Sequence, residues 1–198
     1  MGDRLTDSPE LLRLGIDMDG VVADFNAGWI ERYNRDFGTA LHPDHVVGWD
    51  ELHRLTGFDT MEQFWEWARG DGRSVFRDLP PIPGALDALA DLATRHRIVI
   101  VTARFDWAIG DTLAWLADHG VVAREVHFQA AKHLVSCDVY LDDSPYQIEA
   151  LARERPDRTV CRQVTPWNRP RPGVVDVRSW DEFRDVVSHL EAGHPGEA

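Results

Sequence analysis

Short apolar runs alternate with amphipathic segments along most of the 198-residue chain. The apolar runs have the length of β-strands, and the pattern predicts strands at 12–18, 97–102, 125–128, 138–141 and 159–164. The amphipathic segments carry apolar residues at helical spacing, and the pattern predicts helices at 84–96, 107–119, 145–154 and 180–192. Strands that alternate with helices of this length indicate an α/β fold, a mostly parallel sheet with helices on both faces, in three layers.

One segment interrupts the alternation. Residues 26–78 separate the first strand from the next strand and helix, far more chain than such a connection usually needs. Four tryptophans in this segment argue against a flexible linker. Aromatic residues recur every fourth position over 25–37, and a second helical pattern covers 61–69. We therefore expect a small helical cap at 26–78, inserted after the first strand of a main domain formed by 1–25 and 79–198.

Composition narrows the class of protein. The net charge of −13 argues against binding to a nucleic acid polymer, which needs a concentrated basic surface. No run is long enough for a membrane helix, and the charged first residues do not resemble a signal peptide. The two cysteines, Cys137 and Cys161, lie outside any metal-binding spacing and are expected to be reduced core residues. The sequence thus predicts a cytoplasmic protein with no membrane partner.

Polar side chains gather where the predicted strands end. Asp17 and Asp19 lie at the end of the first predicted strand, and Thr102 ends the second. Asp142 and Asp143 directly follow the predicted strand at 138–141. Because ligands of an open parallel sheet bind beyond the carboxyl ends of its strands, these groups are expected to share one crevice. Residues two apart in an extended chain point to the same side, which places both early carboxylates together.

So many carboxylates in one place repel one another unless a cation lies among them. Hard carboxylate oxygens suit Mg²⁺, and Lys132 can supply a further positive charge. Each of these residues alone has an ordinary structural explanation, as a turn former, a strand residue or a solvated charge. Their combination in this order favours a functional site.

The ordered set resembles the four motifs of the haloacid dehalogenase (HAD) superfamily. Most members of that superfamily are Mg²⁺-dependent phosphohydrolases. The motifs are DMDGV at 17–21, Thr102, Lys132 and the Asp pair at 142–143. The resemblance covers almost the whole chain and implies a Rossmann-like core with a type 1 cap at the predicted insertion. The segments 17–25, 80–89, 135–145 and 180–183 further resemble the 5′(3′)-deoxyribonucleotidases, the cytosolic type C 5′-nucleotidase family.

The resemblance assigns roles in catalysis. Asp17 would attack phosphorus and form an aspartyl-phosphate that water later releases. Asp19 would protonate the leaving alkoxide and then deprotonate that water. Mg²⁺ would be held by Asp17, the backbone carbonyl of Asp19 and Asp142, with Asp143 contributing through a water molecule or by contacting one of these ligands.

The resemblance also assigns the phosphate contacts, with one departure. Thr102 and Lys132 would bind the phosphoryl oxygens, and Gly20 would let the chain turn so that backbone N–H groups approach the phosphate. The nucleotidases follow their Thr with Ser, whereas Ala103 stands here. Arg104 is the candidate to replace that missing phosphate contact, and the change puts nucleotide preference in doubt.

Substrate selection is expected from the cap. Phe25 lies eight residues after Asp17, where the resembling nucleotidases place an aromatic residue that stacks on the base. Trp49 is a second candidate for a substrate contact. The alternative is that both belong to the core of the cap, as the helical spacing of Phe25, Trp29 and Tyr33 also suggests.

Three functions stay open from the sequence. The favoured one is a Mg²⁺-dependent 5′-nucleotidase, whose substrate is a small phosphate monoester, a nucleoside monophosphate. A homodimer is a further expectation for this enzyme. The second is a phosphatase or phosphomutase of the same superfamily for a sugar phosphate or another small metabolite. The third is a non-catalytic binding module that kept the fold, which the complete set of motifs disfavours.

Overall fold

A six-stranded parallel sheet forms the centre of the computed structural model, which describes residues 11–48 and 51–193. The strand order is β3-β2-β1-β4-β5-β6, and every pair of neighbours is parallel. The strands are β1 Arg13–Ile16, β2 Arg97–Thr102, β3 Glu125–Phe128, β4 Val139–Asp142, β5 Thr159–Gln163 and β6 Val174–Val177. The predicted α/β class with a parallel sheet is confirmed.

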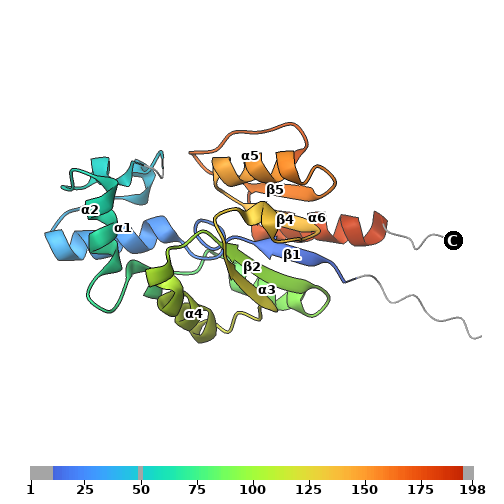
Figure 1. Ribbon diagram of the computed structural model, residues 1–198, viewed down its shortest axis with the longest axis horizontal. Helices are drawn as coiled ribbons and strands as arrows, with labels where there is room; N and C mark the ends of the chain where they lie inside the picture. Colours follow the sequence, from blue (N-terminus) through green and yellow to red (C-terminus); the bar gives the residue numbers. More distant parts are fainter. Residues whose placement is uncertain (1–10, 49–50, 194–198) are drawn as a thin grey trace, which may run out of the picture.

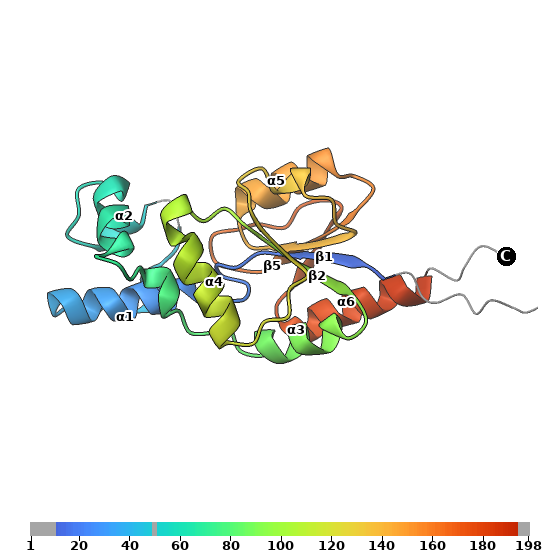
Figure 2. The same ribbon diagram turned by 60° about the horizontal axis from the view of Figure 1, so that its bottom comes forward.

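Helices cover both faces of the sheet. Figure 2 shows α5 on one face and α3, α4 and α6 on the other, which gives the three predicted layers. These helices are α3 Ala85–Ala93, α4 Ile109–Asp118, α5 Pro145–Glu154 and α6 Trp180–Gly193. The start of α5 follows from the sequence: Ser144 accepts a hydrogen bond from the Gln147 N–H and precedes a proline, an arrangement that favours a helix N-terminus.

The apolar core is divided between the two faces. Ile98 and Ile100 of β2 point into the larger cluster, which includes α3 and α6 residues, whereas Val99 and Val101 point into a smaller cluster with α5. Burial on both faces explains why this strand is a continuous apolar run. Both cysteines are buried and unpaired, as predicted.

The segment after β1 leaves the sheet and folds into helices of its own. It contains α1 Phe25–Phe37, α2 Met61–Arg69 and three short 3₁₀ helices at Pro43–His45, Leu52–Leu55 and Val75–Arg77. Figure 1 shows α1 and α2 together beyond one end of the sheet. The predicted boundary after residue 25 falls inside the first turn of α1, and the division into cap and main domain stays a prediction.

The two ends of this insertion are joined by backbone hydrogen bonds. The Asp24 N–H donates to the Pro80 carbonyl at 2.8 Å, and the Ile82 N–H donates to the Val22 carbonyl at 2.8 Å. Ala23 and Pro81 form an antiparallel bridge between them. The chain therefore leaves and rejoins the sheet-bearing part at one place.

Strand β6 is the one element of the described sheet that the pattern did not predict. It lies at the edge of the sheet, and its four residues include the charged Asp176. Asp176 forms a two-point ion pair with the buried Arg162 of β5, so a charged pair accompanies the backbone pairing of the two strands. Within the described residues, no helix has the length and apolar character needed to cross a membrane.

Candidate active site

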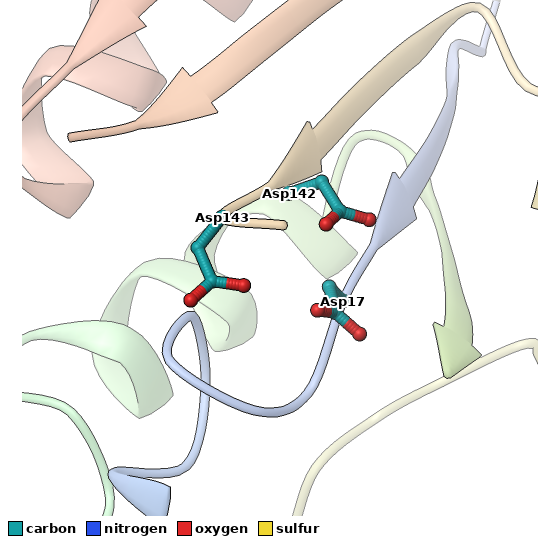
Figure 3. Close-up of side chains that lie close together, drawn as sticks. All are labelled: Asp17, Asp142 and Asp143. Carbon is teal, nitrogen blue, oxygen red and sulfur yellow. The ribbon is translucent and has the colours of Figure 1, made fainter. Parts of the chain in front are cut away.

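Three carboxylates converge at the carboxyl ends of β1 and β4. Asp17 directly follows β1, and Asp142 and Asp143 end and follow β4 (Figure 3). Each offers an oxygen that lies within 4.8 Å of the others, and all three residues are buried. Strands β1 and β4 are neighbours in the sheet, which is why residues 125 positions apart in sequence meet here.

Lys132 lies between two of these carboxylates. Its Nζ atom is 2.7 Å from Asp17 Oδ1 and 2.6 Å from Asp142 Oδ2. Burial of the ammonium opposes its charge, but Asp142 and Asp17 outweigh that effect and hold the pKa of Lys132 above its ordinary value. Lys132 is therefore a permanently charged link between the ends of the two strands, as predicted from its position before β4.

The cluster carries more negative charge than Lys132 can balance. Burial raises the pKa of the Asp17 carboxyl to about 7; Lys132 opposes this shift, while Asp142 and Asp19 add to it. Burial likewise raises the pKa of Asp143 well above its usual range, and the charges of Asp17 and Asp142 raise it further. A divalent cation among these oxygens would relieve the repulsion, so the donor set fits a metal ion.

A cavity of about 540 Å³ opens over this cluster and collects most of the predicted site residues. Thr102 lines it from the end of β2, with 1% of its surface exposed. Asp142 is not among the lining residues, but its carboxylate contacts Lys132, which is, and belongs to the same carboxylate cluster. The residues that were predicted from the sequence and that line the cavity are Asp17, Asp19, Gly20, Phe25, Thr102, Arg104, Lys132 and Asp143. Trp49 lies outside the described residues.

Gly20 has two structural reasons to be glycine. Its φ of +76° lies in the left-handed region, and a Cβ atom there would collide with the Asp143 carboxylate. Its N–H donates to the Ala23 carbonyl at 2.9 Å, within the tight loop after β1. The predicted sharp turn is present, whereas a contact of Gly20 with phosphate stays a prediction.

Arg104 lines the cavity, but its charge is directed at a protein group. It forms a two-point ion pair with the Asp19 carboxylate. The sequence suggested that Arg104 compensates for Ala103 by binding phosphate, because the pattern places it just after Thr102. The contact between Arg104 and Asp19 was not predicted from the sequence. A contact of Arg104 with phosphate stays a prediction.

Aromatic rings of the inserted segment, together with Phe105, also line the cavity. Phe25 lies with its ring centre 5.9 Å from that of Trp65 and 5.5 Å from that of Phe76, with nearly parallel planes. Phe105 packs edge-on against Trp65 and is 43% exposed. Of these rings only Phe25 was singled out from the sequence. Trp65 was within a predicted helix, and its direction toward the cavity depends on how that helix docks.

A buried hydrogen-bond network supports the Asp143 side of the cavity. Trp167 Nε1 donates to Asp143 Oδ2 at 3.2 Å, and Asn168 Nδ2 donates to the Asp143 carbonyl at 2.7 Å. Asn168 in turn accepts a hydrogen bond from Arg162 at 2.7 Å. The loop between β5 and β6 thus fixes the backbone of a candidate metal ligand, a role that the sequence pattern of this loop did not indicate.

A second cavity, of about 700 Å³, lies between the end of α2 and the start of α4. Its walls carry both signs of charge, from Glu66, Arg69, Asp71 and Asp111. It contains none of the residues predicted for the site, so the smaller cavity is the candidate active site.

The same site residues lie within a match to a known family. Residues 11–193 match the family model described as 5′ nucleotidase, deoxy (pyrimidine), cytosolic type C protein. The chain belongs to this family. Its members are phosphoric monoester hydrolases, and the chain is accordingly an enzyme of that class that acts on a small phosphorylated substrate, as expected from its motifs.

Curated relatives agree with the family match. The 5′(3′)-deoxyribonucleotidase of Clostridium acetobutylicum is 27% identical over 180 residues, which cover 90% of this chain and 96% of the relative. The mitochondrial 5′(3′)-deoxyribonucleotidase of Mus musculus is 26% identical over 159 residues, which cover 72% of this chain and 69% of the relative.

Solved structures show the same fold. YfnB of Bacillus subtilis, solved with bound magnesium, superposes with a TM-score of 0.60 at 14% identity, over 89% of this chain and 98% of that protein. A haloacid dehalogenase-like family protein of Streptococcus pneumoniae superposes with a TM-score of 0.60 at 10% identity, over 89% and 98%. The predicted Rossmann-like core, with the fold of haloacid dehalogenase-like proteins, is thereby confirmed.

Proposed function

We propose that the enzyme is a Mg²⁺-dependent 5′-nucleotidase that hydrolyses nucleoside monophosphates, with pyrimidine deoxynucleotides as the favoured class. One observation carries the proposal: a single cavity is lined both by carboxylates with Lys132, here called its polar end, and by the rings of Phe25, Trp65, Phe76 and Phe105, here called its aromatic end. The first set suits a phosphoryl group and a metal ion, and the second suits a flat base. A sugar phosphate has no group to use the aromatic end.

Asp17 is the proposed nucleophile. An Asp17 oxygen bonds to phosphorus while the bond from phosphorus to the sugar oxygen breaks, and Asp19 delivers its proton to that leaving oxygen. Water then attacks phosphorus, its proton passes to the Asp19 carboxylate, and the bond from Asp17 to phosphorus breaks. The phosphate leaves, and both side chains return to their starting state.

Lys132 and Thr102 are the proposed phosphoryl ligands. The Lys132 ammonium has three N–H donors, of which two are directed at Asp17 and Asp142. The third is available for a phosphoryl oxygen, where a fixed positive charge stabilises the transferring group. The Thr102 hydroxyl lies at the end of β2 on the same side of the cavity. The turn at Gly20 would let other backbone N–H groups of the loop after β1 approach the phosphate, because the Gly20 N–H itself donates to the Ala23 carbonyl.

Asp17, Asp142 and Asp143 are the proposed holders of Mg²⁺, together with the carbonyl of Asp19. Each of the three carboxylates offers one oxygen within 4.8 Å of the other two. Carboxylate oxygen is the donor type that Mg²⁺ prefers. When bound, Mg²⁺ lowers the repulsion between the nucleophile and the phosphate dianion. Trp167 and Asn168 hold Asp143 in place for that contact.

The proposal is tested by phosphate release from a panel of substrates in the presence of Mg²⁺. The panel holds pyrimidine and purine nucleoside 5′-monophosphates, with ribose and deoxyribose, and sugar phosphates without a base. We expect the highest kcat/KM for pyrimidine deoxynucleotides and loss of turnover with a chelator. Preference for a sugar phosphate would contradict the proposal. The cytoplasmic location and a homodimer stay predictions from the sequence.

A further inference from the structure

The Asp19 carboxylate is gripped at both of its oxygens by one buried side chain. Arg104 Nη2 is 2.6 Å from Asp19 Oδ1, and Arg104 Nε is 2.9 Å from Asp19 Oδ2. The Arg104 side chain is 1% exposed, whereas that of Asp19 is 28% exposed. The guanidinium therefore lies beneath the carboxylate and leaves its outer side open to the cavity.

Arg104 is itself held on two further sides. Its Nη1 donates to Thr112 Oγ1 at 3.0 Å, and that hydroxyl donates to the Ala108 carbonyl at 2.8 Å. The guanidinium carbon lies 4.4 Å from the centre of the Phe76 ring, in a cation–π contact. Residues of α4 and of the inserted segment thus fix the direction in which Arg104 points.

We propose that Arg104 is a positioning residue that sets the orientation of Asp19 for both proton transfers; this rests on the proposed phosphatase function. A guanidinium fork that binds both oxygens fixes the plane of a carboxylate, which a lysine ammonium does not. Three of the five N–H donors of Arg104 are directed at Asp19 and Thr112. The positive charge of Arg104 is consequently paired with Asp19 and is not free to bind a phosphate.

The orientation leaves Asp19 able to act. An ionised carboxylate has about four acceptor positions, and Arg104 uses one on each oxygen. One of the remaining positions carries the proton when Asp19 acts as the acid and is empty when it acts as the base. Asp19 lines the cavity in which the leaving oxygen and later the water must lie. Loss of Arg104 should therefore slow the steps that need the proton of Asp19 and spare a step that needs no proton.

Two substrates separate these steps. A nucleoside 5′-monophosphate releases an alkoxide that must be protonated, whereas 4-nitrophenyl phosphate releases a stable phenolate without help. The experiment compares Arg104→Met, Arg104→Lys and Asp19→Asn with the wild type. Steady-state kcat and KM are measured for the nucleotide, and the rapid first release of 4-nitrophenolate is measured by stopped flow.

We expect Arg104→Met to lower kcat for the nucleotide by about 10²-fold, close to the effect of Asp19→Asn. The rate of first 4-nitrophenolate release should stay near the wild-type rate, because this leaving group does not need a proton from Asp19. Arg104→Lys should recover only part of the loss, since it keeps the charge and loses the fork. Arg95→Met is the control, because Arg95 forms a comparable but exposed ion pair with Asp91 and Glu191.

A double variant decides between positioning and phosphate binding. If Arg104 acts through Asp19, adding Arg104→Met to Asp19→Asn should cost little more than Asp19→Asn alone. A full additional loss, with KM raised for both substrates, would show a phosphate ligand and overturn the proposal. Equal loss of both rates in an active, folded enzyme would also overturn it.

Folding and the underlying function have their own readouts. If Arg104→Met does not fold, Thr112→Val removes only the hydroxyl that holds Nη1, and a smaller loss with the same substrate pattern is expected. If the same small loss affects both substrates alike, the proposal fails. A wild type that hydrolyses no phosphate monoester would overturn the phosphatase function and this inference together, whereas the outcomes above concern Arg104 alone.

Discussion

The two ends of the cavity differ in how their side chains are held. At the polar end, Asp17 and Asp142 follow or end neighbouring strands and share one buried lysine, so the sheet itself sets their spacing. At the aromatic end, Phe25 and Trp65 come from helices of the insertion and contact each other through rings alone. The difference separates a fixed chemical centre from a wall that depends on how the insertion packs.

The largest expected effect is at the polar end. Asp17→Asn should reduce phosphate release to background, because an amide oxygen is too weak a nucleophile to displace the sugar alkoxide. Binding of a nucleoside monophosphate, measured by calorimetry with Mg²⁺, should survive, since the aromatic wall is intact. Residual turnover near the wild-type level would remove Asp17 from its role.

Lys132→Met tests whether the polar end is held by charge. The variant leaves Asp17 and Asp142 buried without their cation, which should lower the free energy of unfolding by about 3–5 kcal/mol in a chelator. Mg²⁺ should restore part of the stability, because it replaces the missing positive charge. Urea unfolding with and without Mg²⁺ measures both effects, and kcat should fall by about 10²–10³-fold. Unchanged stability in the chelator would show that the pair is not needed for folding.

Phe105→Ala tests the aromatic end. Removal of a ring that stacks on a base should cost about 1–3 kcal/mol, which raises KM for a nucleotide by about 5- to 150-fold. KM for ribose 5-phosphate, which has no base, should not change. Phe37→Ala is the matched control, because Phe37 is also a half-exposed ring but lies outside the cavity. An equal rise in KM for both substrates would show that Phe105 does not contact the base.

The last expected effect concerns pH in the absence of metal. Burial raises the pKa of Asp17 from 3.8 to about 7, so the folded protein keeps a proton that the unfolded chain releases. The stability that this group contributes is therefore full below about pH 4 and is lost as pH rises toward 7. Urea unfolding of the wild type and Asp17→Asn in a chelator should show a steeper decline with pH for the wild type. Saturating Mg²⁺ should flatten the difference, because it favours the ionised form.

Much of the polar end could be predicted because polar residues that directly follow an apolar run mark the end of a strand. Asp17 and Asp142 follow apolar runs, and a parallel sheet must bring the carboxyl ends of such runs to one edge. Strand β2 was predicted to the residue, since an apolar run buried on both faces has only one interpretation at that length. Strand β6 was missed because it is an edge strand with a charged residue, whose partner Arg162 lies on another strand.

The aromatic end and the Arg104 contact could not be predicted in the same way. The direction of Trp65 depends on the docking of α2, and spacing along the chain says nothing of docking. Arg104 has a long side chain that could reach either a phosphate or a neighbouring acid, and only the position of Thr112 and Phe76 decides between them. Trp167 lies in a loop without periodicity, so its hydrogen bond to Asp143 had no pattern to indicate it.

The two ends of the insertion are joined by hydrogen bonds between 22–24 and 80–82, directly after the loop that carries Asp19 and Gly20. A graft at these two points would exchange the rings of Phe25, Trp65 and Phe76 and would leave Phe105 and the strands of the sheet in place. If the insertion selects the substrate as proposed, replacement of one contiguous stretch of the gene would change that selection without altering the carboxylates at the strand ends.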